Sequence, residues 1–238
     1  HRDHRGFLLN WDGGITFTYH VILEDDQSWE DVDPTAAIHG VLGRPTPVEI
    51  LSIQPWTAHA LVADRYRQGR VFLAGDAVHL FSPTGGFGMN TGVSDVIDLT
   101  WKIEACLDGW AGPRLLDSYE AERRPIGFRK TLEAADCFDR SYAVMREGDV
   151  IDEESAEGEA TRERLRKMIL EQEKLIVSSG TLLGYRYENS DIIVPDGTEE
   201  PPDDARQYVP VARPGHRAPH MWLADDTSIL DHFAKGFT

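Results

Sequence analysis

One segment of the chain, residues 69–92, constrains the fold more than any other. It reads Gly-Arg-Val-Phe-Leu-Ala-Gly-Asp-Ala-Val-His-Leu-Phe-Ser-Pro-Thr-Gly-Gly-Phe-Gly-Met-Asn-Thr-Gly. The compact apolar run 70–74 ends in Gly75-Asp76, which is typical of a buried strand that presents a carboxylate at its carboxyl end. After a loop, apolar residues recur at helical spacing between positions 93 and 107 and predict a helix that enters the core. Strand, loop and helix in this order indicate an α/β domain.

The chemistry of this segment suits a ligand with a polyol chain, a flat ring and a negative charge. The Asp76 carboxylate can accept hydrogen bonds from hydroxyl groups such as those of a ribityl chain, and the preceding glycine leaves the backbone open for close approach. Three glycines between Pro83 and Gly88 give a loop with little side-chain bulk that can lie along a ring. A helix capped by Asn90 or Thr91 directs its unpaired N–H groups and positive dipole end at this loop. A reduced flavin, whose N1–C2=O2 edge carries negative charge, fits these features.

Each feature alone is common, and a Gly-rich loop before a helix can bind any phosphate. Their combination resembles the second flavin-binding motif of the group A flavoprotein monooxygenases, the family of para-hydroxybenzoate hydroxylase, phenol hydroxylase and 3-(3-hydroxyphenyl)propionate hydroxylase. The resemblance runs from about Trp56 to Phe128 and includes Asp98-Leu99-Thr100-Trp101-Lys102 and Glu122-Arg123-Arg124-Pro125. A further stretch, 214–220, looks like the lead into the thioredoxin-like C-terminal domain of the larger members.

The resemblance implies an FAD-dependent enzyme that uses NADPH or NADH and O2. Such an enzyme hydroxylates a phenolic or polycyclic aromatic substrate through a flavin C4a-hydroperoxide. By the same resemblance Asp76 binds the ribityl chain, and the backbone of Pro83 lies beside the reactive flavin edge, with no side-chain acid or base assigned. The implied cofactor-binding residues are Gly75, Asp76, Pro83, Gly85, Gly86, Gly88, Met89 and Asn90, and the candidate substrate-lining residues are Phe81 and Thr84.

Two motifs of that family do not occur in the sequence. No Gly-x-Gly-x-x-Gly stands between a strand and a helix near the start, and the Asp-Gly motif linked to pyrophosphate and NAD(P)H contact is also absent. We therefore expect both motifs to belong to an N-terminal half upstream of His1.

The expected fold class is α/β, with a partial doubly wound FAD-binding domain, a mixed-sheet substrate domain, a helical middle segment and the start of a thioredoxin-like C-terminal extension. The expected boundaries are 1–62 for part of the substrate-binding sheet domain, 63–112 for the C-terminal part of the FAD-binding domain, 113–180 for the helical segment, and 181–238 for the linker and the start of the C-terminal domain.

Local patterns predict the other secondary structure. Period-two alternation over 6–23 predicts a hairpin that turns at Asp12-Gly13-Gly14. Asp33 suits an N-cap and Pro34 the first turn of a helix that Gly43 ends. The remaining expectations are two strands across 48–65, helices over 113–124 and from Pro125 to about 146, a helix over 154–177 that ends before Gly180, and loops with short strands from 181 onward.

Composition excludes several classes of function. Lys and Arg total 24 against 41 Asp and Glu, and the net charge of −17 argues against nucleic acid or an anionic membrane as partner. The two cysteines, Cys106 and Cys137, lack metal-type spacing, no metal site is predicted, and a cytoplasmic location fits best. We expect His79 to be a hydrogen-bonded packing residue and Arg123-Arg124 to be structural rather than phosphate-binding.

Two alternatives remain beside hydroxylation. An FAD-dependent dehydrogenase, reductase or halogenase could use the same framework, and a non-catalytic flavin or ligand carrier would need only the loop that binds the ring. A homodimer is a candidate assembly. The substrate, the ring position that is hydroxylated and the choice between NADH and NADPH cannot be deduced from these residues.

Overall fold

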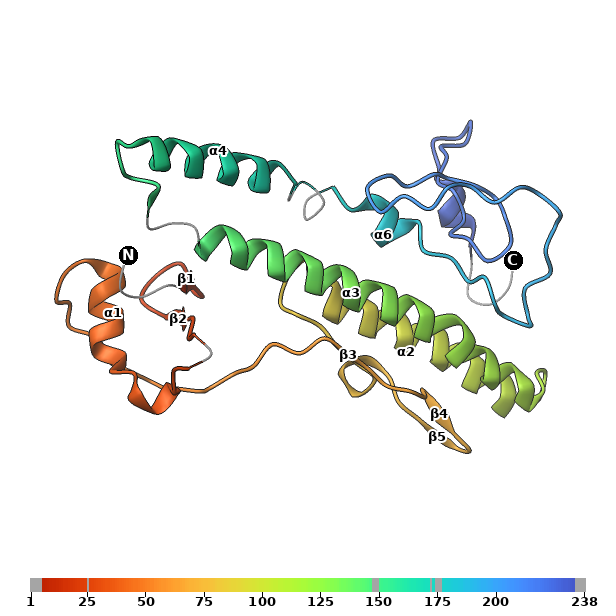
Figure 1. Ribbon diagram of the computed structural model, residues 1–238. Coiled ribbons are helices and arrows are strands. Elements are labelled where there is room, and N and C mark those ends of the chain that lie inside the picture. The colour runs from red at the N-terminus through yellow and green to blue at the C-terminus, as the bar shows by residue number, and fades with distance from the viewer. Residues whose placement is uncertain (1–5, 25, 147–149, 172, 174–176, 234–238) are drawn as a thin grey trace. The chain divides into compact units, whose positions relative to one another are not determined.

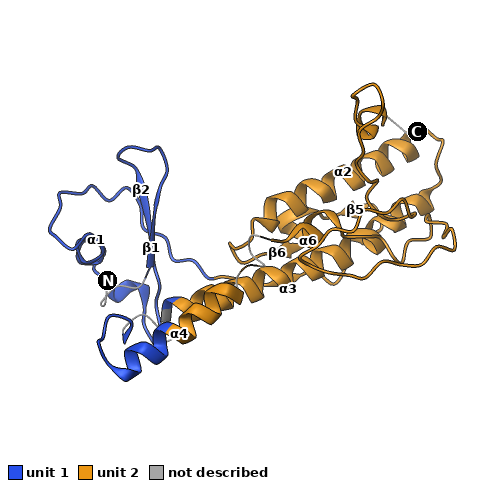
Figure 2. Ribbon diagram, turned by 90° about the horizontal axis from the view of Figure 1, so that it is seen from above, with its two compact units in different colours: residues 1–57, 145–162 blue, residues 58–144, 163–238 orange. Residues whose placement is uncertain are grey.

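The computed structural model describes residues 6–24, 26–146, 150–171, 173 and 177–233. It divides into two compact units, residues 1–57 with 145–162 and residues 58–144 with 163–238 (Figure 2). No helix in the described part of the chain combines the length and the apolar character needed to cross a membrane.

The first unit contains the predicted hairpin and short helix. Strands β1 (Gly6–Asn10) and β2 (Phe17–Val21) pair antiparallel with Leu8 opposite Tyr19, so the predicted hairpin is confirmed. Its turn is held by the Asp12 carboxylate, which accepts hydrogen bonds from the backbone N–H groups of Gly14 at 2.8 Å and Thr16 at 3.2 Å. The helix α1 that follows the hairpin is shown with it in Figure 1.

Helix α1 (Pro34–Leu42), preceded by the short 3₁₀ turn η1 (Trp29–Asp31), begins and ends where the sequence predicts. The Asp33 side chain accepts from the N–H groups of Thr35 and Ala36, which satisfies two donors of the first turn, and Pro34 at the first position has no N–H to satisfy. Gly43 ends the helix at φ 69°, a left-handed conformation that glycine adopts without strain.

The strands of the second unit are short, and two predictions for them are wrong. Strand β3 (Leu61–Val62) pairs antiparallel with β6 (His79–Leu80), and β4 (Arg67–Gln68) pairs antiparallel with β5 (Val71–Phe72). The run 70–74 is therefore part of a two-stranded ribbon rather than a buried strand, and Val71 is 64% exposed. No parallel neighbour covers it among the described residues.

The two strands predicted across 48–65 reduce to β3. Residues 48–60 have no regular secondary structure. Pro55 lacks an N–H for a ladder hydrogen bond, and a strand also needs a pairing edge. A high content of β-branched residues is therefore not sufficient for a strand at these positions.

Two long helices, α2 (Phe87–Leu107) and α3 (Ser118–Arg146), dominate the second unit, joined through the 3₁₀ segment η3 (Pro113–Asp117) (Figure 1). The predicted break at Pro125 is wrong, because α3 runs through it. Proline removes one i→i−4 hydrogen bond. Buried side chains on both sides of Pro125, those of Arg123 and Ile126, keep the helix in place across that loss.

From residue 181 onward the described chain contains little regular structure, as predicted, but the short strands predicted there reduce to one isolated bridge. Helix α4 (Ala156–Glu171) lies within the range 154–177, of which 172 and 174–176 fall outside the described residues. Gly180 was expected to follow a helix but lies inside the short α6 (Ser179–Leu183). A 3₁₀ turn, η5 (Ile229–His232), and an isolated bridge between Trp222 and Ser228 complete the elements.

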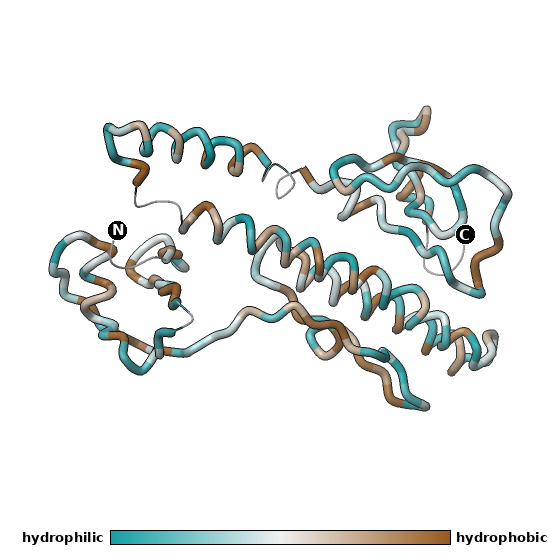
Figure 3. The backbone as a smooth tube through the Cα atoms, in the orientation of Figure 1, coloured by the Kyte–Doolittle hydropathy of each residue, from teal (hydrophilic) through white to brown (hydrophobic). Residues whose placement is uncertain are grey.

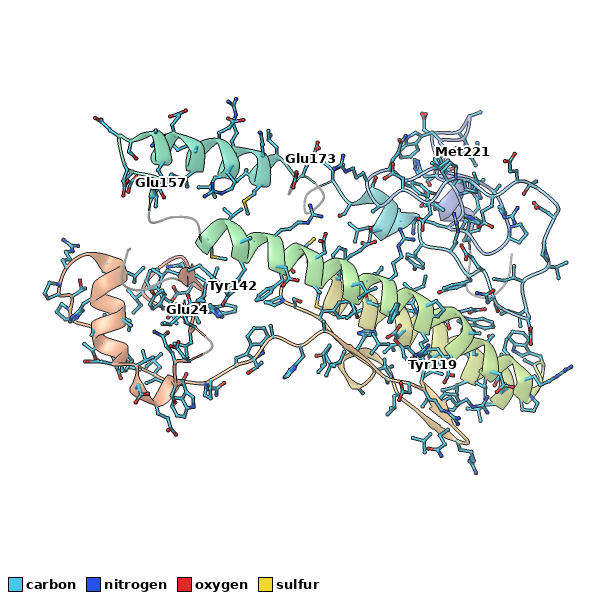
Figure 4. The ribbon with its side chains drawn as sticks, viewed as in Figure 1. Glu24, Tyr119, Tyr142, Glu157, Glu173 and Met221 are labelled. Atoms are coloured by element: carbon cyan, nitrogen blue, oxygen red, sulfur yellow. The ribbon has the colours of Figure 1, made fainter. Side chains whose placement is uncertain are left out.

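The apolar core of the second unit is small and aromatic. Tyr66, Val78 and Tyr119 are fully buried together, and the rings of Tyr66 and Tyr119 lie 5.9 Å apart. The Tyr119 hydroxyl donates to the Leu73 carbonyl at 2.8 Å, which ties α3 to the end of the ribbon; Tyr119 is labelled in Figure 4. Apolar residues also lie in β3 and β5 (brown in Figure 3), whereas the intervening β4, Arg67–Gln68, is polar (teal).

Helix α2 buries its polar face rather than its apolar face. Val93, Val96 and Ile97, expected to enter the core, are 52%, 53% and 64% exposed. Phe87 and Ala105 are buried near the two ends of the helix, and the four buried positions between them are polar and recur at helical spacing: Thr91, Asp95, Asp98 and Lys102. The periodicity thus predicted the helix correctly and its buried face wrongly, because Arg123 and Glu122 of α3 supply charged partners to the polar face.

Candidate functional site

The carboxylate predicted to bind the ligand lies in a tight turn against α2. The segment η2 (Gly75–Ala77) is a 3₁₀ turn, and within it the Asp76 side chain is exposed. Gly75 has φ +60°, and a Cβ on Gly92 would lie 3.2 Å from the Gly75 Cα. Glycines at both positions therefore let the turn and the first part of α2 approach closely.

A buried carboxylate on α2 fixes this turn. Asp95 is completely buried, and its Oδ2 accepts from the Gly75 backbone N–H at 3.1 Å and from His79 Nε2 at 2.7 Å. Its Oδ1 accepts from Arg123 Nε at 2.8 Å. Burial by itself would raise the pKa of Asp95, but the hydrogen bond from His79 and the charge and hydrogen bond of Arg123 hold that pKa below its ordinary value. Asp95 is thus an ionised hub between the turn, α2 and α3.

Arg123 extends this hub to the C-terminal segment. The guanidinium is fully buried and donates to the Tyr187 hydroxyl at 3.2 Å and to the Thr91 carbonyl at 3.4 Å. It also lies 5.6 Å from the ring centroid of Tyr185, a cation–π distance. Burial raises the pKa of the Tyr187 hydroxyl, with Arg123 acting in the opposite direction, so Tyr187 stays a neutral donor and acceptor. The expectation that Arg123 is structural is confirmed by these contacts.

A second buried ion group lies further along α2. Lys102 Nζ donates to Asp98 Oδ2 at 2.7 Å and also to Glu122, whose other oxygen accepts from the Ser190 hydroxyl. Burial raises the pKa of Asp98 to about 6, with the charge and hydrogen bond of Lys102 acting against it. One ammonium group therefore serves two carboxylates, and the group joins α2, α3 and the C-terminal segment.

A buried lysine stands beside Arg123. Burial and the neighbouring Arg123 charge lower the pKa of Lys130 to about 8, and its Nζ lies 4.6 Å from the ring centroid of Tyr185. The Tyr185 ring therefore faces two cations, Arg123 and Lys130. This arrangement packs the C-terminal segment against α3 and presents no group to a ligand.

The glycine-rich loop connects β6 to the start of α2. Gly85 and Gly86 have φ +74° and +67°, and a Cβ on Gly85 would lie 2.3 Å from the Phe87 ring. Pro83 is exposed, whereas the Thr84 hydroxyl donates to the Ala134 carbonyl on α3 at 2.6 Å. Thr84 therefore anchors the loop, and its hydroxyl is engaged rather than free for a substrate.

The first turn of α2 begins earlier than the sequence predicts. Gly86 is the N-cap, and neither Asn90 nor Thr91 caps the helix. The Asn90 amide donates to the Gly86 carbonyl at 2.8 Å, and the Thr91 hydroxyl donates to the Phe87 carbonyl at 2.7 Å. The left-handed glycine replaces a side-chain cap, so the unpaired N–H groups of this turn stay available at the end of the loop.

The structure brings the predicted residues together in two groups. Gly75 and Asp76 lie in η2, and Gly85, Gly86, Gly88, Met89 and Asn90 form the loop end and first turn of α2. Met89 is 78% exposed, and Phe81 is half-buried with its ring 4.7 Å from His79. The His79 side chain is buried and hydrogen-bonded, as expected.

Sequence reasoning gave no role to Asp95, Tyr66 or Tyr187. The sequence pattern that could have indicated Asp95 is the set of polar residues at 91, 95, 98 and 102, which share one face of α2. The apolar residues of the same helix were instead expected to be its buried face. A polar stripe at helical spacing ordinarily indicates a solvated face. Only the partners that α3 supplies, Arg123 for Asp95 and Glu122 for Lys102, show that this face is buried.

Comparison with known proteins agrees with this geometry. The model of the FAD binding domain family matches residues 20–134. The chain is 38% identical over 208 residues to the FAD-dependent monooxygenase opdD of Penicillium oxalicum, covering 84% of the chain and 40% of that protein. It is 39% identical over 207 residues to 4-methyl-5-nitrocatechol 5-monooxygenase of a Burkholderia species, covering 84% of the chain and 34% of that protein. It superposes on the crystal structure of the flavin-dependent monooxygenase PieE in complex with FAD and substrate with a TM-score of 0.75 at 33% identity, covering 90% of the chain and 41% of PieE.

The fold and the site thus define part of an FAD-binding domain. The relatives and the solved structure that the chain matches are FAD-dependent monooxygenases, and the family resemblance found in the sequence is confirmed. The chain spans between 34% and 41% of the length of these three relatives.

Proposed function

We propose that the protein is an FAD-dependent monooxygenase that uses NADPH or NADH and O2 to hydroxylate a phenolic or polycyclic aromatic substrate, by the oxygen-transfer route that the family resemblance implies. The observation that carries the proposal is the pairing of an exposed carboxylate, Asp76, with a bare glycine loop that leads directly into the N-terminus of α2. The similarity of the chain to an FAD-dependent monooxygenase and to the FAD binding domain family supports it.

The residues present fit an FAD molecule. Asp76 is exposed and receives no hydrogen bond from the described residues, so its oxygens are available to ribityl hydroxyls. Gly85 and Gly86 adopt left-handed conformations, and the loop around Pro83 offers a surface with little side-chain bulk. The N-terminus of α2 favours negative charge near Gly88 and Met89. When bound, FAD would supply the oxidation–reduction chemistry, as cofactors do in such enzymes.

The tasks of this chain's own residues are binding, orientation and electrostatics. Asp76 would hold the polyol chain, the backbone of Pro83 and Gly88 would border the ring, and the dipole of α2 would stabilise negative charge on it. Phe81, half-buried beside the loop, is proposed to line the substrate side. No nucleophilic side chain is required.

The decisive test is oxidation of NADH and NADPH by the full-length protein with and without candidate aromatic substrates. We expect substrate to accelerate NAD(P)H oxidation and isotope-labelled O2 to place one labelled oxygen in the product. NAD(P)H oxidation with no labelled product would indicate a dehydrogenase or reductase. FAD binding with no oxidation in any combination would indicate a flavin carrier and would overturn the proposal.

Three further expectations accompany this function. We propose a cytoplasmic location, which agrees with the two cysteines of the sequence forming no disulfide framework by their number and spacing. A homodimer is proposed as the assembly. The division at 62, 112 and 180 into substrate-sheet, FAD-binding, helical and C-terminal parts is retained as the proposed domain organisation.

A further inference from the structure

We propose that Asp95 is a positioning residue that sets the FAD-binding geometry by joining the Asp76 turn to the N-terminus of α2. This inference rests on the proposed function, because it assigns a role within the same cofactor site. Asp95 touches no ligand itself and acts through the backbone and side chains that it holds.

The first step is the placement of its hydrogen bonds on either side of Asp76. Asp95 Oδ2 accepts from the N–H of Gly75, the residue before Asp76, and from the ring of His79, three residues after it. One oxygen atom therefore anchors both ends of the turn. Between these anchors the Asp76 side chain is exposed. A carboxylate directed at a ligand binds best when its backbone is already fixed, since less conformational entropy is then lost on binding.

The second step is the rigid connection from Asp95 to the start of α2. Asp95 lies seven residues after Gly88 in one uninterrupted helix, a distance of about 10 Å along the axis. The helix N-terminus and Asp76 are the two features proposed to meet the flavin. Asp95 is part of helix α2 and its hydrogen bonds hold the Asp76 turn. It therefore sets the distance between the helix N-terminus and Asp76.

The third step explains how a buried carboxylate can be kept there. Asp95 is fully buried, and an unpaired charge at such a position would be strongly destabilising. Arg123, also fully buried, donates to Oδ1 and leaves Oδ2 free for the turn. Oδ1 therefore pairs with the Arg123 charge, while Oδ2 holds the turn that carries Asp76.

The test compares two buried carboxylates of α2 in the full-length protein. Asp95→Asn keeps one acceptor oxygen of two, so its NH2 group faces a donor on either the turn side or the Arg123 side, and we expect the Kd for FAD to rise about tenfold or more. Asp98→Asn makes the same chemical change three residues further along, at a side chain that binds Lys102 and not the turn. We expect its Kd for FAD to stay within about twofold of the wild type. The flavin midpoint potential and visible spectrum are measured on both variants.

A second variant guards against loss of folding in Asp95→Asn. His79→Phe removes one anchor of the turn and keeps the ion pair of Asp95 with Arg123, so no buried charge loses its partner. We expect a rise in the FAD Kd of about threefold to tenfold, together with a shifted midpoint potential. His79→Gln, whose amide can still donate to Asp95, should restore part of the affinity.

The outcomes separate this inference from the proposed function. Wild-type protein that fails to bind FAD would refute the proposed function. Wild-type protein that binds FAD, with His79→Phe and any folded Asp95→Asn matching Asp98→Asn in Kd and potential, would overturn the positioning role alone. Equal loss of affinity in all three variants would assign the effect to general destabilisation and would overturn it as well.

Discussion

Two aspartates of the site differ in their surroundings, and the difference divides their roles. Asp76 is exposed, and the described residues leave its carboxylate oxygens open to a ligand. Asp95 is buried, and Gly75, His79 and Arg123 occupy its acceptor positions. An ionised carboxylate is an acceptor only. Asp76 can therefore bind hydroxyl groups of a ligand. Asp95 can affect the ligand only indirectly, through Gly75, His79 and Arg123.

The role of Asp76 is tested by Asp76→Ala. We expect the full-length variant to fold normally and to bind FAD more weakly by about 1–3 kcal/mol, the usual effect of leaving a buried hydroxyl without its acceptor. Titration of the apoprotein with FAD, followed by flavin fluorescence, measures the change. Asp64→Ala, which removes an exposed carboxylate outside the turn, is the control. An unchanged affinity in Asp76→Ala would exclude Asp76 as a ribityl ligand.

The buried Asp98 predicts a pH dependence of stability. Burial raises its pKa from 3.8 to about 6, so the folded state keeps the proton to a higher pH than the unfolded chain does. The stabilisation is complete below the unfolded pKa and is lost as the pH rises through about 6. Between about pH 4 and about pH 7.5 this group should lower the free energy of unfolding by on the order of 2 kcal/mol.

Urea denaturation of the wild type and Asp98→Asn at both pH values measures this effect. The amide does not titrate, so the variant should gain on the wild type as the pH rises. A stability difference that is the same at low and neutral pH would show that Asp98 does not hold its proton in the folded protein.

At the scale of the elements, α2 shows which part of the structure periodicity can predict. The spacing of Val93, Val96 and Ile97 is helical, and residues 87–107 do form a helix. The same spacing does not say which face is buried, because that depends on the partners. Asp95 and Lys102 pair with Arg123 and Glu122 of α3, and no short-range pattern links those positions.

Local chemistry predicted α1 better than α3 for the same physical reason. The cap at Asp33 and the stop at Gly43 depend on neighbouring residues alone, so the sequence sufficed. The passage of α3 through Pro125 depends on buried contacts from other elements. In the site, the turn, the loop and the following helix could be predicted from one contiguous segment, whereas the Asp95 hub, which draws on α3 and the C-terminal segment, could not.

The N-terminus of α2 is tested by adding charge to its first turn. Met89 is 78% exposed there, so Met89→Glu should leave the fold intact. If this helix end faces the flavin, the new carboxylate disfavours the anionic reduced form and lowers the midpoint potential, by an amount equivalent to about 0.3–1 kcal/mol. Met89→Gln, nearly the same size and uncharged, is the matched control. A midpoint potential that is equal in the two variants, or higher in Met89→Glu than in Met89→Gln, would show that the N-terminus of α2 does not face the flavin.

At the scale of the whole molecule, the described chain leaves apolar surface that its own residues do not cover. Val93 and Ile97 of α2 and Val71 of β5 are each more than half exposed, and the chain spans about 40% of the relatives it matches. Exposed apolar surface can mark an interface. We propose that the rest of the FAD-binding domain covers these side chains.

The final prediction concerns a polypeptide limited to residues 1–238. Its sequence contains no Gly-x-Gly-x-x-Gly between a strand and a helix, so it lacks that means of binding a pyrophosphate at a helix N-terminus. Its ribbon at β5 also lacks parallel neighbours among the described strands. We expect this polypeptide to aggregate, to be colourless after gel filtration and to be inactive toward NAD(P)H, whereas the full-length protein purified in parallel should be yellow. A monomeric preparation of residues 1–238 that binds FAD with micromolar affinity would show that the Asp76 turn and the α2 N-terminus hold the cofactor unaided, and that the exposed face of α2 needs no cover.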